Sequence, residues 1–96
     1  MKEYTKTRYH KNFVYYKNDE IIGASLREYG EYAQTEVNFL LDIIDIIIGD
    51  PVVVYDVGSN IGYHATAFAS KNTEVYCFEP NPLNFKLLKE NTKHLP

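Results

Sequence analysis

Two short apolar runs, joined by a glycine turn and a helical stretch, constrain the fold of this chain more than any other feature. Residues 52–55 read Val-Val-Val-Tyr and residues 74–78 read Glu-Val-Tyr-Cys-Phe, and both are typical of strands that are covered on both faces of a parallel sheet. Between them, Gly58 and Gly62 mark a turn, and small residues predict a helix that ends near Ser70. Parallel strands need such a crossover, which is right-handed. The segment therefore predicts a β-α-β unit.

Two further helices are expected to flank this unit. From Glu36 the apolar residues recur at helical spacing, and Gly49 followed by Asp50-Pro51 predicts the end of that helix. After the second strand, Asn81-Pro82 pairs an N-cap residue with a proline at the first helical position. The residues that we expect to face the core are Val37, Leu40, Leu41, Ile44, Ile47 and Ile48 in the first helix, and Leu83, Leu87 and Leu88 in the second.

Residues 1–35 form an N-terminal arm. The apolar run at 13–16, a polar turn at 17–19 and the pair Ile21-Ile22 predict a β-hairpin within it. The sequence from 24 to 35 leaves its own structure open.

Residues 36–96 are then expected to form a partial Rossmann-like domain, in the order helix, strand, helix, strand, helix. The predicted fold class is α/β: a β-hairpin arm followed by a half-fold with parallel strands, which is an incomplete sheet. A chain of 96 residues has room for one hydrophobic core and for no separate substrate domain.

Charge, cysteine content and hydropathy limit the classes of partner. The net charge of −3 disfavours nucleic-acid binding through a broad basic surface. The most hydrophobic segment, residues 39–48, contains two aspartates and is too short to cross a bilayer, so we expect no membrane-spanning helix. A lone cysteine, Cys77, and a polar start after Met1 predict a cytoplasmic protein.

The glycine turn and the acid that ends the second strand predict a nucleoside site, because ligands of parallel sheets bind at the carboxyl ends of the strands. Gly58 permits a sharp turn, and Gly62 removes a side chain where the helix begins. Glu79 follows Gly58 by 21 positions, so its carboxylate can accept from both hydroxyls of a ribose. Turn chemistry alone also explains the glycines, and Asp56 can serve either as a turn cap or in binding.

Other cofactor and metal sites fit the sequence less well. A dinucleotide fingerprint starting at Gly58 needs glycines at Asn60 and Tyr63, which disfavours an oxidoreductase. A P-loop is excluded, because the chain has no Gly-Lys-Ser/Thr. No cysteine or histidine has a partner at ligand spacing, so no metal site is predicted.

Two linked motifs carry a resemblance to a known family. DVGSNIG at 56–62 and FEPNP at 78–82 strongly resemble the turn and the second strand end of FkbM-type S-adenosylmethionine-dependent methyltransferases. The stretch GEYAQTEVNFLLDII at 30–44 is similar to the entry segment of that family. The resemblance covers about residues 19–94, and Ser59 stands where the family usually has alanine.

The resemblance implies a set of residues that bind S-adenosyl-L-methionine. It places the glycine turn against the methionine half of the cofactor and Glu79 against its ribose. Asp56 would orient the turn or meet the ammonium group, and Glu36 would reach the pocket from the entry helix. The full set is Glu36, Asp56, Gly58, Asn60, Gly62, Tyr63, Glu79, Pro80 and Asn81. His64 is expected only to line the pocket, and no residue is assigned as a catalytic base.

The implied activity is methyl transfer to a hydroxyl of a sugar, a glycan or a small metabolite. The acceptor site is expected outside this cofactor-binding portion. An alternative is that the chain is a non-catalytic interaction module or a truncated remnant, which pairs with another chain or with a second copy through the open edge of its sheet.

Overall fold

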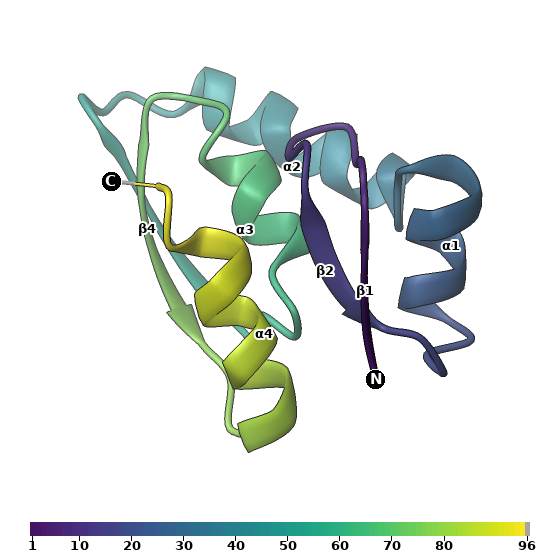
Figure 1. The fold of residues 1–96 in the computed structure, drawn as a ribbon. Coiled ribbons are helices and arrows are strands. Elements are labelled where there is room, and N and C mark those ends of the chain that lie inside the picture. Colours follow the sequence, from purple (N-terminus) through teal and green to yellow (C-terminus); the bar gives the residue numbers. More distant parts are fainter. Residues whose placement is uncertain (96) are drawn as a thin grey trace.

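A computed structural model describes residues 1–95, and in that part the chain forms a β-hairpin, four helices and a two-stranded parallel sheet (Figure 1). The predicted α/β class is therefore confirmed. The elements are β1 (Lys2–Thr5), β2 (Phe13–Tyr16), α1 (Ile22–Tyr29), α2 (Gln34–Ile46), β3 (Val52–Val57), α3 (Tyr63–Phe68), β4 (Thr73–Phe78) and α4 (Pro82–Thr92).

The sheet is built from the two strands that the apolar runs predicted. β3 and β4 are parallel, with a register from Val52 opposite Thr73 to Val57 opposite Phe78. The two strands therefore end level with each other, and the turn after β3 lies next to the residue that follows β4. This alignment brings the two predicted motifs together.

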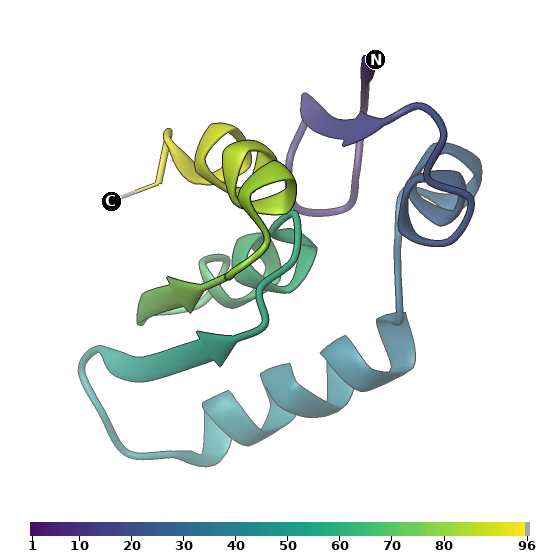
Figure 2. The same ribbon diagram turned by 90° about the horizontal axis from the view of Figure 1, so that it is seen from below.

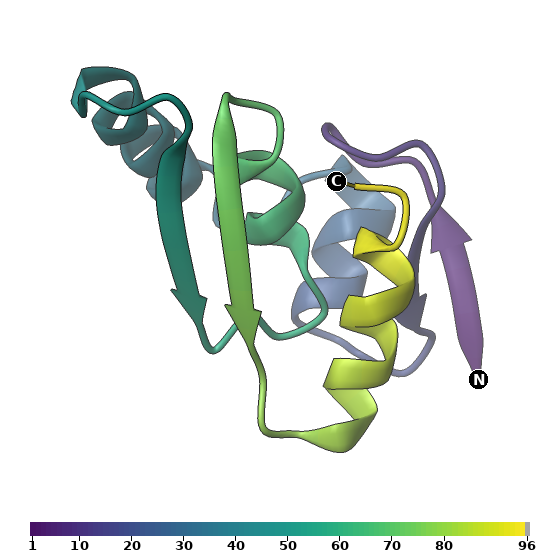
Figure 3. The ribbon, with the colours of Figure 1, turned by 90° about the vertical axis from the view of Figure 1, so that its left-hand side faces the viewer.

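The expectation that both faces of this sheet are covered is wrong. Val53, Tyr55 and Val57 of β3 alternate with buried or half-buried neighbours and are 56%, 69% and 79% exposed. Tyr76 and Phe78 of β4 are exposed on the same side. Figure 3 looks onto this open face, with the helices behind the strands. An unbroken apolar run is buried on both faces of a sheet only if helices cover both faces, and here helices cover one face.

The arm contains a hairpin, but its strands differ from those predicted. β2 pairs antiparallel with β1, so that Thr5 lies opposite Phe13, and Ile21-Ile22 is not a strand. Instead the Asp19 carboxylate accepts hydrogen bonds from the N–H groups of Ile21 and Ile22, both at 3.0 Å. These bonds turn the chain into α1, which accounts for much of the segment that the sequence left open.

Two helices also differ in detail from the prediction. α2 ends at Ile46, because Ile47 takes an extended conformation, and the side chains of Ile47 and Ile48 are exposed rather than buried. In α4, Leu87 and Leu88 are buried but Leu83 is 63% exposed. The Asn81 cap is confirmed, since its Oδ1 accepts from two N–H groups of the first turn.

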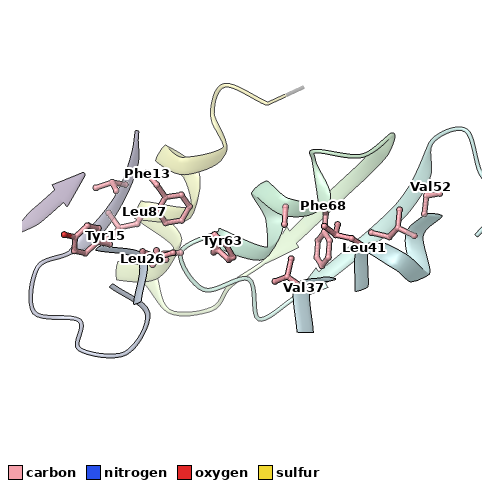
Figure 4. Close-up of a cluster of buried hydrophobic side chains, with 13 residues drawn as sticks. Phe13, Tyr15, Leu26, Val37, Leu41, Val52, Tyr63, Phe68 and Leu87 are labelled. Atoms are coloured by element: carbon pink, nitrogen blue, oxygen red, sulfur yellow. The ribbon is translucent and has the colours of Figure 1, made fainter. Parts of the chain in front are cut away.

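One hydrophobic cluster joins the arm to the rest of the chain (Figure 4). Phe13 and Leu26 pack in the same cluster as Tyr63 and Leu87, and all four are almost fully buried. Figure 2 shows the hairpin on the far side of α3 and α4 from the end of α2. None of the described helices is long and apolar enough to cross a bilayer.

A buried asparagine ties three segments to one another. The Asn91 side chain, on α4, is 1% exposed. Its Oδ1 accepts from the Val14 N–H at 2.8 Å, and its Nδ2 donates to the carbonyls of Val14 at 3.0 Å and Ile61 at 2.8 Å. A primary amide presents the same donor and acceptor as a peptide group, so Asn91 takes the place of a neighbouring strand beside β2. It thereby fixes the hairpin against the turn that follows β3.

Candidate functional site

A cavity of about 560 Å³ opens at the carboxyl end of β3, which is a size typical of small-molecule sites. It lies between α2, β3, the turn 58–62 and α3. Of the predicted site residues, it is lined by Glu36, Asp56, Gly58, Asn60 and Tyr63. Ile22 and Tyr32 of the arm and Leu40 of α2 line it as well. The sequence did not indicate them as site residues, because the path of the arm was not predicted and Leu40 was expected to face the core.

The two glycines of the turn have different roles. Gly58 has φ of +80°, and a Cβ added there would meet no atom within 4 Å. The place of its missing side chain is therefore open space, and Gly58 is one of the residues that line the cavity. Gly62 has φ of +103°, but a Cβ there would lie 2.9 Å from Cδ1 of Leu88. Gly62 is thus required for the packing of α4 and does not line the cavity.

Glu79 holds the turn to the end of β4. Its Oε1 accepts from the Asn60 N–H at 2.8 Å, and its Oε2 accepts from the Asn81 N–H at 3.1 Å. These two bonds leave lone pairs on both carboxylate oxygens, because each oxygen can accept more than once. Glu79, Pro80 and Asn81 lie beside the turn rather than on the wall of the cavity, and Pro80 and Asn81 are exposed.

Asp56 carries the clearest sign of a missing partner. It is the second-last residue of β3 and is half-buried, and its Oδ2 is buried with no hydrogen-bond partner among the described residues. Burial raises the pKa of the Asp56 carboxyl above its usual value, although Ser59 and His64 act in the opposite direction. A buried acceptor without a donor is costly, so this oxygen is suited to a cationic or hydrogen-bonding ligand group.

Glu36 and His64 meet across the cavity from different helices. The Nε2–H of His64, on α3, donates to Oε1 of Glu36, on α2, at 2.8 Å. The His64 side chain is 21% exposed and that of Glu36 is 65% exposed. No spacing in the sequence predicted this pair, because the two residues are joined only by the packing of α2 on α3.

Tyr63 serves the core more than the cavity. It is 2% exposed, its hydroxyl donates to Oε1 of Gln34 at 2.6 Å, and its ring packs edge-on against Phe13. Burial raises the pKa of the Tyr63 hydroxyl above its usual value. Its hydroxyl is therefore already bonded within the protein.

Among curated proteins, a hexuronic acid methyltransferase (AglP) of Haloferax volcanii is similar to part of this chain. The two sequences are 50% identical over 44 residues, which make up 46% of this chain and 18% of the relative. That match indicates a methyltransferase relationship. The similarity covers under a fifth of the relative's own length. No family model matches the sequence, and no solved structure matches it.

Proposed function

We propose that this chain is the cofactor-binding portion of an FkbM-type methyltransferase that uses S-adenosyl-L-methionine. The observation that carries the proposal is the cavity at the end of β3, where Asp56 presents a buried oxygen without a partner beside the open space at Gly58. The cofactor bears an ammonium and a sulfonium, for which carboxylates are suitable neighbours. The methyltransferase relative supports the same activity.

The residues present fit the cofactor in three places. Glu79 has lone pairs left for ribose hydroxyls after its two bonds to the backbone. Gly58 allows the ligand to approach the backbone closely, and Asp56 offers an acceptor at the strand end. When bound, the cofactor supplies an electrophilic methyl group. The residues of this chain bind and orient that donor, and such alignment is a large part of catalysis of a displacement.

The proposed acceptor is a hydroxyl of a sugar, a glycan or a small metabolite. The similar protein of Haloferax volcanii is named a hexuronic acid methyltransferase, which favours a sugar as the acceptor. Acceptor binding is proposed to need residues outside the cofactor-binding portion, and none of the residues in the cavity is assigned as the base.

Calorimetric titration with S-adenosylhomocysteine tests the proposal. We expect wild-type protein to bind, and Glu79→Gln to lower the affinity about 10- to 100-fold, the equivalent of about 1 to 3 kcal/mol. Glu74→Gln is the matched control, because Glu74 is an exposed glutamate near the start of β4, at the opposite end of that strand from Glu79 and the glycine turn. Absence of binding by the wild-type protein would overturn the proposal, and an equal loss in both variants would remove Glu79 from the site.

A second candidate function is self-association through the open face of the sheet. This open face is formed by Val53, Tyr55, Val57, Tyr76 and Phe78. The Tyr55 ring packs edge-on against the rings of Tyr76 and Phe78, with 5.4 Å and 6.0 Å between ring centres. The three aromatic side chains of the open face together expose on the order of 300 Å² of surface, since one aromatic side chain has roughly 150–250 Å².

We propose a second copy of the chain as the occupant of this face. A stable interface needs about 800 Å² from each partner, somewhat more than half of it apolar, and the rings with the two valines can supply the apolar centre. Two copies can pack these faces against each other about a two-fold axis.

Sedimentation equilibrium over a range of concentrations tests this candidate. Tyr55→Glu is expected to abolish association, whereas Tyr29→Glu, at a similarly exposed tyrosine of α1, is the control and leaves it intact. A wild-type protein that stays monomeric at every concentration would refute it.

A further inference from the structure

One face of α4 is the surface against which the hairpin lies. Near the start of this helix, the Tyr16 hydroxyl donates to the carbonyl of Leu83 at 2.9 Å. Near its end, Nζ of Lys2 donates to Oε1 of Glu90 at 3.1 Å. Asn91, which bonds to β2, shares this face with Leu83 and Glu90, because these positions are about two turns apart on a helix. The arm therefore docks on α4 over the length of that helix.

Two histidines extend this interface beyond the end of α4. His10 lies in the connection between β1 and β2, and His94 lies in the turn that follows α4. The centres of the two rings are 4.2 Å apart, with 58° between the ring planes. The His10 ring also packs edge-on against the buried Phe13. The arm and the end of α4 thus meet through two titratable rings in direct contact.

A hydrogen bond shows which protonation state of His10 fits this arrangement. The Asn12 N–H donates to Nδ1 of His10 at 3.0 Å. Nδ1 can accept only while it carries no proton, so the His10 ring is neutral here, and protonation would place two donors against each other. The His10 backbone is held by Thr7, whose Oγ1 accepts the His10 N–H at 3.1 Å and whose N–H donates to the His10 carbonyl at 2.8 Å.

The charged groups near the two rings do not compensate a positive charge on His10. Lys11 and Lys93, which adjoin the two histidines in the chain, are cations. The Glu90 carboxylate, one turn before His94, is already bonded to β1. Among residues 1–95, no carboxylate forms an ion pair with either ring. Burial lowers the pKa of His10, and the nearby His94 acts in the same direction.

We propose that the contact between His10 and His94 is a pH-sensitive switch, which holds the arm on α4 while both rings are neutral and loosens it as they take up protons. Because docking lowers the pKa of His10, docking is strongest above the usual pKa of about 6.5 and weakens as the pH falls below it. Ile22 and Tyr32 of the arm line the cavity, so loosening of the arm also opens one wall of the cavity.

Hydrogen exchange of the Val14 amide reports on docking, because this N–H is bonded to Asn91 of α4. For the wild-type protein we expect its protection factor, corrected for the intrinsic exchange rate, to be about 3- to 10-fold lower at about pH 5 than at about pH 7, which corresponds to the loss of one hydrogen bond. His10→Asn should show the same protection at both pH values, because asparagine accepts from the N–H two residues on but does not titrate.

Two further variants separate this contact from other histidine effects. His94→Asn should reduce the loss of protection and raise the pKa of His10 toward its usual value, which an NMR titration of the ring measures. His64→Asn is the matched control, because it makes the same substitution at a histidine of α3 that contacts Glu36. It should leave the wild-type loss unchanged.

The switch is refuted if the wild-type protein loses no protection between the two pH values, or if His10→Asn loses as much as the wild type. Disappearance of the loss in His64→Asn would also refute it, because the pH dependence would then belong to another site. An equal loss at the amide of the buried Leu41, in α2, would refute it as well, since the whole chain would then be unfolding rather than the arm.

Discussion

Replacing Asn91 by alanine should destabilise the fold more than any other single change of a polar side chain described above. Its amide makes three buried hydrogen bonds, two to Val14 and one to the carbonyl of Ile61. Each contributes about 1 kcal/mol net, and the alanine also leaves three backbone groups without partners in the core. We expect a loss of about 3 kcal/mol, which is a large share of the roughly 5–14 kcal/mol typical of a chain of this length.

Thermal unfolding followed by circular dichroism measures the effect. A loss of about 3 kcal/mol in a domain of this size lowers Tm by roughly 12–24 °C. Asn84→Ala is the matched control: it makes the same substitution on the same helix, at a side chain that makes no hydrogen bond among the described residues. It should raise stability by a few tenths of a kcal/mol through helix propensity. A Tm of Asn91→Ala within a few degrees of this control would refute the reasoning.

Three further predictions concern the turn and the acid that precedes it. Gly58→Ala should lower the free energy of unfolding, measured by urea titration, by about 1–2 kcal/mol, because the residue has a positive φ. It should also weaken the binding of S-adenosylhomocysteine, because the added methyl group occupies space that is now open. Gly62→Ala should lower the free energy of unfolding by at least about 1 kcal/mol more than Gly58→Ala, since the added Cβ would lie 2.9 Å from the buried Leu88 side chain. Equal losses of stability in the two variants would contradict this. Burial raises the pKa of Asp56, so its ionised form disfavours folding above the usual pKa and this penalty disappears as the pH falls below it. Asp56→Asn should therefore raise Tm at about pH 7 and raise it less at about pH 4, and a gain that is independent of pH would exclude this cause.

Local patterns predicted the parts of the site that depend on neighbours in the chain. The apolar runs located β3 and β4, and the Asn81-Pro82 pair located the start of α4, because strand burial, proline geometry and side-chain capping act over a few residues. The spacing of Gly58 and Glu79 along the sequence also predicted that the two residues lie close together, since parallel strands in register end side by side.

The remaining features depend on contacts between residues far apart in the chain. Whether β2 pairs with residues 2–5 or with Ile21-Ile22 depends on the competition between a strand and the helix that Asp19 initiates. The contact of Glu36 with His64 depends on how α2 packs against α3. Neither is encoded in a local period, because hydrophobic spacing specifies which side of an element is buried but not which element covers it.

The amino-acid pattern therefore established a β-α-β unit, a glycine turn at a strand end and an acid on the neighbouring strand. Chain packing added three things that no pattern contained: the buried oxygen of Asp56 without a partner, the histidine across the cavity from Glu36, and a sheet face left open to solvent. The physical reason is the range of the forces involved. Backbone geometry and capping are satisfied within a turn or two of chain, whereas burial and pairing are properties of the surfaces that meet after the chain has folded.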